Sequence, residues 1–447
     1  MTPWSDDAGF ADKLGKTVLA AYENLPQRGK PQGNEWTVLA AVVLARQHAT
    51  HTAGYGLQVL VLATGNKCLG ESQLCEKGTV VNDCHAEILA RRGLKKLLWD
   101  DLGLLARKEK SRVPAVLDSR SFKPNGMGCM VPGDSLHLYI SETPCGDASI
   151  VIESPSDHTS SGKDAIVRLT GARLLGKRKE LHAAPELGCL RTKSGRCDLQ
   201  PGKRTTSMSC SDKILSWCFG GIQGGLLSHF VTPIYLSSVV VGTSAQSGND
   251  CNQAALNSLR RSIIERANAV IKSKSTGDKM TNHRSFGVPR VYVCNVKFAA
   301  TRPKLTSRQR LKRPSKEKPS PACGYALLSI WPGQKSCEFS EVLVASRGIR
   351  QGASKKSVPC KLPRKIWSSV CKYIFFENFL AIRSSVENRC PPELITYAEI
   401  KAAATSYVRD KVYFFEHHAY NTWLRMPKSY LNFVLCDTET DAKNVHE

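Results

Sequence analysis

Three short segments that lie far apart in the chain carry side chains able to bind a metal ion or move a proton: Asn82-Asp83-Cys84-His85-Ala86-Glu87, Ser141-Glu142-Thr143-Pro144-Cys145-Gly146-Asp147-Ala148-Ser149 and Met208-Ser209-Cys210-Ser211-Asp212-Lys213. In the second segment, Cys145 follows Pro144 at a predicted turn from a strand into a helix. A thiol at the N-terminus of a helix is stabilised by the helix dipole as the thiolate, the form that binds metal. A His-x-Glu or a Pro-Cys sequence alone is more often structural, so the evidence lies in their combination.

Taken in order, the His-x-Glu and Pro-Cys sequences match the pattern of the zinc-dependent nucleoside deaminases. The usual pattern continues Pro-Cys-x-x-Cys, but here Ala148 stands at the last position. A catalytic zinc requires three protein ligands and one open position for water, so a second thiolate must come from elsewhere in the chain. Cys210 is a candidate, because it too precedes a predicted helix.

The three segments together resemble the RNA adenosine deaminase (editase) family. The similarity continues through Trp217 and Gly221-Ile222-Gln223-Gly224-Gly225-Leu226-Leu227, and it extends from about residue 35 to about residue 435. The resemblance implies that zinc is held by His85, Cys145 and Cys210. It also implies that Glu87 is not a ligand but shuttles protons while water replaces the amino group of adenosine, which yields inosine and ammonia.

Two other interpretations of these motifs are open. A non-catalytic RNA-binding protein with a closed, structural zinc site would need a fourth Cys or His, and Cys84 is one candidate. Editing of double-stranded RNA is the second alternative. Family members with that activity carry RNA-binding modules ahead of the catalytic domain, whereas here the residues before His85 are taken up by a helix and strands of the domain itself. We therefore expect tRNA as the substrate.

Within the family, the arrangement is similar to the eukaryotic tRNA-specific enzymes that act on the adenosine 3′ of the anticodon (position 37) of alanine tRNA. Arg196 lies near the place where editing enzymes have an acidic residue that fills the space of the flipped base. A base in a single-stranded anticodon loop needs less help to leave its stack. The resemblance also places Asn66 near the target ribose, and Asn66, its neighbour Lys67 and Arg196 are the expected RNA contacts.

The family also buries inositol hexakisphosphate behind its active site, and ten residues of this chain fall on the binding positions: Arg91, Arg92, Lys213, Trp217, Lys372, Tyr397, Lys401, Tyr407, Lys411 and Trp423. If a single helix spans 396–418, its two tyrosines and two lysines of this set lie within about 120° of arc. A helix face exposed to solvent would account for the two lysines, but not for the two tyrosines on the same side. Burying so many cations without a polyanion would cost several kcal/mol per ion. Ser216, Gly225 and Met426 depart from the family pattern at this site.

The elements that must position these residues alternate between strands and helices. Apolar and β-branched stretches predict strands at 35–46, 57–64, 136–140 and 234–242. Apolar spacing and N-terminal signals predict helices at 11–25, 84–99 (preceded by Asn82-Asp83), 211–219, 366–382 and 396–418. This order indicates an α/β fold in which helices flank a mixed sheet. The resemblance specifies a cytidine-deaminase-like sheet with a C-terminal helical extension that encloses the polyanion.

We predict a single domain over residues 1–447, with its core at about 35–435 and surface insertions at 272–288 and 302–322. The net charge of +24 over 447 residues favours a nucleic-acid partner. The basic stretches 302–318 and 346–365 are candidate tRNA phosphate contacts, and the first is equally a disordered loop or a nuclear localisation signal.

The 17 cysteines are scattered and no signal peptide precedes them, so most should be reduced thiols. No apolar run approaches the ~20 residues of a membrane span. We therefore expect a protein of the nucleus or cytoplasm, with tRNA as its partner, no membrane association and no evident protein partner.

Overall fold

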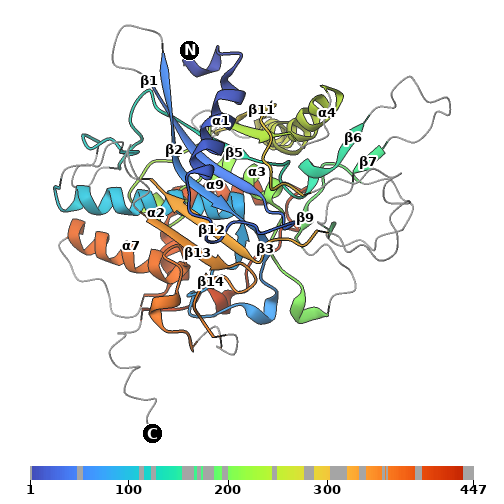
Figure 1. The fold of residues 1–447 in the computed structure, drawn as a ribbon. Coiled ribbons are helices and arrows are strands. Elements are labelled where there is room, and N and C mark those ends of the chain that lie inside the picture. The colour runs from blue at the N-terminus through green and yellow to red at the C-terminus, as the bar shows by residue number, and fades with distance from the viewer. Residues whose placement is uncertain are drawn as a thin grey trace, which may run out of the picture.

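An eight-stranded mixed sheet forms the centre of the molecule, with its strands in the order β11-β10-β5-β1-β2-β12-β13-β14 (Figure 1). The computed structural model describes residues 3–435 apart from 48–53, 110–114, 122–126, 154–165, 169–172, 175–185, 194–199, 244–248, 276–285, 303–319, 332–338, 355–357, 359–360 and 388–394. β1 pairs antiparallel with both β2 and β5, whereas β10 runs parallel to β5 and β11. The strands of this sheet are β1 (Leu39–Gln47), β2 (Tyr55–Thr64), β5 (Ser135–Ile140), β10 (Ser238–Gly242), β11 (Arg290–Cys294), β12 (Tyr325–Ile330), β13 (Phe339–Val344) and β14 (Ile349–Arg350).

Short strand pairs and helices complete the described part of the chain. The pairs are β3 (Asn66–Cys68) with β4 (Asp83–His85), β6 (Val151–Glu153) with β7 (Ile166–Arg168), and β8 (Arg173–Leu174) with β9 (Arg191–Thr192). The α-helices are α1 (Phe10–Glu23), α2 (Ala86–Ala106), α3 (Cys210–Gly220), α4 (Asn249–Leu259), α5 (Arg266–Ser275), α7 (Lys372–Glu387), α8 (Tyr397–Ala403) and α9 (Thr405–Phe415), and a π-helical turn at Arg260–Glu265 joins α4 to α5.

Helices cover both faces of the sheet, and the central strand β1 shows why. Successive side chains of a strand point to opposite faces. Ala40 and Val42 belong to the larger hydrophobic cluster, which side chains of α2, α3 and α7 also enter. Ala41 and Val43 belong to a second cluster, together with Leu14 of α1. Because both faces of β1 are buried, its sequence is a continuous apolar run rather than an alternating one.

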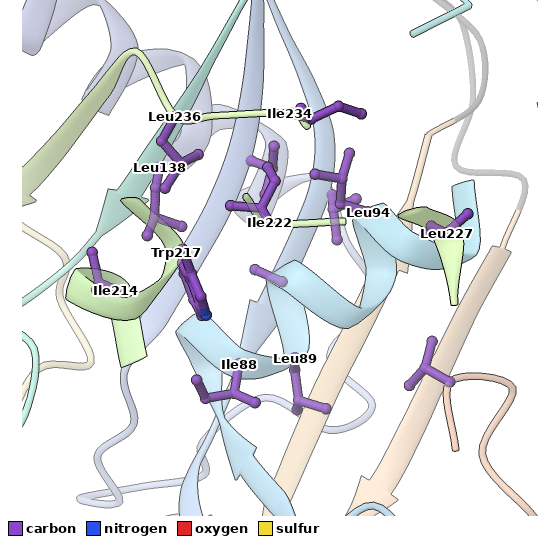
Figure 2. Packing of buried hydrophobic residues seen from close by; sticks show 14 of the residues in the cluster. Ile88, Leu89, Leu94, Leu138, Ile214, Trp217, Ile222, Leu227, Ile234 and Leu236 are labelled. Atoms are coloured by element: carbon purple, nitrogen blue, oxygen red, sulfur yellow. The ribbon is translucent and has the colours of Figure 1, made fainter. Parts of the chain in front are cut away.

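The contact between α2 and α3 forms the interior next to the chemical motifs. Figure 2 shows Trp217 of α3 in the same cluster as Ile88 and Leu94 of α2 and Leu138 of β5. All four side chains are at most 8% exposed. Both helices begin at the motif residues, so this packing sets the relative position of the two motifs.

Gly93 allows α2 to lie directly against β2, because a Cβ at this position would be 2.4 Å from Cγ1 of Val61. Replacing Gly by Ala within a helix usually stabilises it by about 0.5–1 kcal/mol. Here the extra methyl has no space, so we expect Gly93→Ala to lower the free energy of unfolding by about 1–3 kcal/mol in urea titrations. Gly103→Ala on the same helix is the control, since the nearest atom there is the flexible end of Arg107 at 3.4 Å. A stabilising effect at both positions would show that α2 is not held against the sheet in this way.

The predicted α/β architecture is confirmed, and the predicted strands and helices are found with shifted ends. Two details were wrong. The predicted helix over 396–418 is two helices, α8 and α9, which are separated at Ala404, where ψ is 70°. The residues after Pro144 form only a three-residue 3₁₀ turn, Asp147–Ser149, so Cys145 is not at the start of an α-helix.

The regions expected to be insertions lie largely outside the described residues, which omit 276–285 and 303–319. Parts of the basic stretch 346–365 are also outside them. No described helix has the length and apolar character needed to cross a membrane.

Candidate metal centre and active site

His85, Cys145 and Cys210 converge on one point. Nδ1 of His85 lies 3.8 Å from Sγ of Cys145 and 3.6 Å from Sγ of Cys210, and the three potential ligand atoms all lie within 4.8 Å of one another. No fourth Cys, His, Asp or Glu of the described residues joins this group. One imidazole and two thiolates suit a zinc ion, and three protein ligands leave a coordination position open. The group could therefore hold a metal ion in the manner of a catalytic rather than a closed site.

Three different local structures present these side chains. His85 ends β4 and is the N-cap of α2, while Cys210 is the first residue of α3 after the N-cap Ser209. The third side chain, Cys145, lies in the loop after β5. The backbone N–H of Cys210 donates to Sγ of Cys145 at 3.3 Å, and that of Ser211 donates to the carbonyl of Cys145 at 3.0 Å. The start of α3 therefore holds the loop through main-chain hydrogen bonds.

Gly146 makes this close approach possible. Its φ is +108°, a region that side chains disfavour, and a Cβ there would be 2.1 Å from Oγ of Ser209. Asp212 fixes the same corner from within α3: its carboxylate accepts from the Ser209 hydroxyl at 2.6 Å and pairs with Arg266 at 2.8 Å. Because Asp212 is fully buried, this ion pair anchors the N-terminus of α3 and, with it, Cys210.

Glu87 lies in the first turn of α2, two residues after His85. It is 2% exposed, and its Oε2 has no hydrogen-bond partner among the residues that the structure describes. Burial raises the pKa of this carboxyl, although the nearby His85 partly offsets the effect. A buried carboxyl that leaves one oxygen unpaired beside a three-ligand group has the properties of a proton carrier.

A chain of charges leads away from Cys210. Nζ of Lys193 donates to Sγ of Cys210 at 3.0 Å and to the carboxylate of Asp83 at 2.9 Å. Lys213 approaches the other oxygen of Asp83 at 2.6 Å. Burial alone would lower the pKa of Lys193, but Asp83 and the two thiols hold it well above its ordinary value. The ammonium of Lys193 therefore favours the ionised, metal-binding form of the Cys210 thiol that it contacts, against the burial that raises the pKa of that thiol.

Lys193 is a residue of this site that no sequence motif identifies. Asp83 and Lys213 both lie inside the quoted motifs, whereas Lys193 lies in a loop between β9 and α3 and has no motif around it. The one hint in the sequence was the acidic residue Asp83, two residues before His85. If its carboxylate is buried, it needs a cation from some other segment as a counter-charge.

We expect Asp83→Asn to lower the free energy of unfolding by about 3–5 kcal/mol, because it leaves the ammonium of Lys193 buried without its counter-charge. Lys193 and Lys213 hold the pKa of Asp83 well below its ordinary value. The stabilisation is thus present at neutral pH and is lost as the pH falls through that lowered pKa. Denaturant titrations at pH 7 and at acidic pH measure both effects.

The control is Asp100→Asn, which breaks an i,i+4 pair with Lys96 on α2 whose carboxylate is 25% exposed. That change should cost only about 0.3–0.5 kcal/mol. Equal losses in the two variants would show that Asp83 has no special electrostatic role.

A group of five cations and two tyrosines lies behind the motifs, which we call the cationic cluster: Arg91, Arg92, Lys372, Lys401, Lys411, Tyr397 and Tyr407. The pKa of both Lys372 and Lys411 is lowered to about 7. Desolvation is the larger cause, and repulsion from neighbouring cations is the smaller one. Nη2 of Arg92 is buried without a hydrogen-bond partner among the described residues. None of the five cations forms an ion pair with a described carboxylate. These observations fit a site for a polyanion.

The other three residues expected at this site differ in their surroundings. Trp217 lies against Arg91, whose guanidinium carbon is 5.1 Å from the ring centre. Lys213 is directed to Asp83, and Trp423 packs on Phe414 and Phe415 of α9. The two tyrosines and two lysines of the C-terminal region come from two helices rather than one: Tyr397 and Lys401 lie on α8, and Tyr407 and Lys411 lie on α9.

The three expected RNA contacts have different outcomes. Asn66 lies on β3 directly opposite His85 of β4, and its Oδ1 is buried without a partner among the described residues. Lys67, the next residue of β3, lies opposite Cys84 of β4 in the register of the two strands. Arg196 lies outside the described residues. β3 therefore runs along one side of the candidate metal centre.

Comparison with known proteins agrees with this arrangement. The model of the adenosine-deaminase (editase) domain matches residues 61–427. A tRNA-specific adenosine deaminase 1 of Drosophila melanogaster is 29% identical over 94% of this chain and 96% of its own length, and that of Mus musculus is 27% identical over 95% and 99%. A double-stranded RNA-specific adenosine deaminase of Mus musculus is 30% identical over 97% of this chain but only 33% of its own length. The chain therefore belongs to the adenosine-deaminase (editase) family, and it is an adenosine deaminase enzyme.

Proposed function

We propose that the protein is a zinc-dependent enzyme that hydrolyses adenosine to inosine in tRNA, at the position 3′ of the anticodon (position 37) of alanine tRNA. The observation that carries this proposal is the convergence of His85, Cys145 and Cys210 within 4.8 Å beside the buried, unpaired oxygen of Glu87. Membership of the family supports deamination of adenosine in RNA. The identity of the metal as zinc, the tRNA substrate and the position of the adenosine are proposals.

In this mechanism His85, Cys145 and Cys210 would hold the zinc. When bound, zinc lowers the pKa of a water molecule and so supplies a nucleophile near neutral pH. Oε2 of Glu87 would take a proton from the attacking water and give it to a ring nitrogen of the purine. It would then take the proton of the hydroxyl newly attached to the ring carbon and give it to the amino group, which leaves as ammonia. Nζ of Lys193 donates to Sγ of Cys210 and keeps that thiolate in place. Asn66, which faces His85 across the β3–β4 pair, and Lys67 contact the RNA beside the target base.

The choice of tRNA rests on the relatives. The chain matches nearly the full length of the tRNA-specific deaminases but one third of the double-stranded RNA-specific enzyme. Percentage identity does not separate the two groups, because it is 29% for one and 30% for the other. The net charge of +24 suits either RNA. Access to tRNA implies action in the nucleus or the cytoplasm.

Inositol hexakisphosphate is the proposed occupant of the cationic cluster. Arg91, Arg92, Lys372, Lys401 and Lys411 supply the positive charge, and Tyr397 and Tyr407 supply hydroxyl groups. Five desolvated cations without a described counter-ion would otherwise destabilise the fold by several kcal/mol per ion. Lys213, the sixth basic residue expected at this site, is directed instead to the carboxylate of Asp83.

The test is to incubate the purified protein with an unmodified alanine tRNA transcript and, separately, with a long RNA duplex. Zinc content is measured in parallel. Inosine 3′ of the anticodon supports the whole proposal. Inosine in the duplex alone would move the protein to the double-stranded RNA editing activity. Bound zinc with no inosine in either RNA would favour a non-catalytic RNA-binding protein.

A further inference from the structure

Lys95 lies on the same face of α2 as two residues already described. It follows Glu87 by eight residues and Arg91 by four, and such spacings place side chains one above another on a helix. The three residues extend over about 12 Å of the helix, from the candidate metal centre toward the cationic cluster. The sequence analysis did not single out Lys95.

Two other segments cover this lysine. Its Nζ lies 4.6 Å from the ring centre of Phe375 on α7. In the loop after α3, a Cβ at Gly224 would lie 3.6 Å from Nζ of Lys95 and 3.2 Å from Nη2 of Arg91. The ends of Arg91 and Lys95 therefore lie close together between α2, α7 and the bare backbone of Gly224.

The ammonium of Lys95 has no ion pair or hydrogen bond with any described residue, and it lies over the face of the Phe375 ring. The charged groups that act on it are Arg91, Arg92 and Lys401, all cations, and desolvation together with this repulsion lowers its pKa well below the ordinary value. The next residue, Lys96, differs: it pairs with Asp100 at 2.9 Å. A cation–π contact alone is worth less than the desolvation of an ammonium costs.

We infer that Lys95 is a further phosphate-binding residue of the cationic cluster, and that it shares one phosphate group with Arg91 beside Gly224. This inference rests on the polyanion site proposed above. With Lys95, the cluster carries six cations that no described carboxylate pairs with: Arg91, Arg92, Lys95, Lys372, Lys401 and Lys411. A carboxylate or a single phosphate group cannot balance that charge, so the ligand class is a compact molecule with several phosphate groups.

The test compares Lys95→Met with Lys96→Met. The two substitutions remove the same group from adjacent positions of α2, but only Lys95 faces the cluster. Each protein is purified from the same host and denatured, and the released inositol phosphate is measured per mole of protein; Tm is recorded before denaturation. We expect Lys95→Met to lower Tm by several degrees relative to Lys96→Met. It should also lose inositol phosphate at a urea concentration at which the wild type and Lys96→Met retain it.

The direction of the Tm shift separates the possibilities. Without a polyanion, removal of an ammonium surrounded by cations relieves repulsion, so Lys95→Met would raise Tm. Lys95→Arg, which keeps the charge, should restore both Tm and retention. If Lys95→Met accumulates poorly, Lys95→Gln takes its place in the same comparison.

The amount of inositol phosphate released by the wild type decides which of the two proposals a negative result overturns. Inositol phosphate in the wild type together with equal retention and Tm in the two Met variants would overturn the role of Lys95 and leave the polyanion site standing. A wild-type protein that releases no inositol phosphate would overturn the polyanion proposal and this inference with it.

Discussion

Glu87→Gln is expected to lower kcat for inosine formation by about 10²–10⁴-fold, the range that a positioned general acid–base contributes. The substitution keeps the shape of the side chain and removes its ability to carry a proton. Because Oε2 of Glu87 has no partner among the described residues, the amide breaks no hydrogen bond there, and Tm should not fall. Single-turnover assays on the RNA substrate, with zinc analysis of the same samples, measure the effect.

Zinc content separates the proposed role of Glu87 from the role of a ligand. Glu87 does not belong to the three-residue group, so the variant should retain its metal. A Glu87→Gln protein that lost zinc would mean that the carboxylate is a ligand and that the mechanism is different. Asp100→Asn, which removes another carboxylate of α2 at the half-buried pair with Lys96, should keep both zinc and activity.

Cys210→Ala should abolish both metal binding and inosine formation. The change leaves two protein ligands, and no other Cys, His, Asp or Glu of the described residues lies close enough to replace the third. Even the loss of a residue that only supports a ligand typically costs 10–100-fold in metal affinity, and the loss of a ligand itself costs more. Metal analysis after purification and dialysis, followed by the deamination assay, gives both readings.

The matched control is Cys218→Ala on the same helix. Cys218 is also buried, but its thiol contacts the carbonyl of Ile214 rather than the metal-binding group. It should retain zinc and activity, with a modest loss of stability from the cavity. If Cys210→Ala kept a full complement of zinc, the third ligand would have to be another cysteine, and the site would need reassignment.

The helix break at Ala404 illustrates where local signals fail. The start of α8 was readable, since Thr396 and Glu399 form a capping box whose residue types are visible in the sequence. Its end was not, because Ala is the strongest helix former and neither Pro nor Gly marks the break. Ala404 is buried, at 4% exposure, so the packing of its surroundings overrides its preference for helix.

Cys145 shows a similar limit. Its participation in the metal-binding group was predicted from the Pro-Cys motif, but its position was expected at the start of a helix. The structure places it in a loop, and main-chain hydrogen bonds from Cys210 and Ser211 hold that loop against α3. The motif pointed to a residue that does lie in the three-residue group, although the support for its position comes from another segment.

The sequence by itself determined the strands and helices, the three candidate ligands and the carboxyl beside them. These features depend on residue type and on spacing along the chain, which a motif or a periodic pattern records directly. Tertiary structure alone decided the partners of the lysines. Lys193 and Lys95 are indistinguishable in sequence from surface lysines, because burial and charge pairing arise from segments far away in the chain. In the fold, Lys193 meets Asp83 and Cys210, while Lys95 lies beside Phe375 of α7 and the loop at Gly224, among cations.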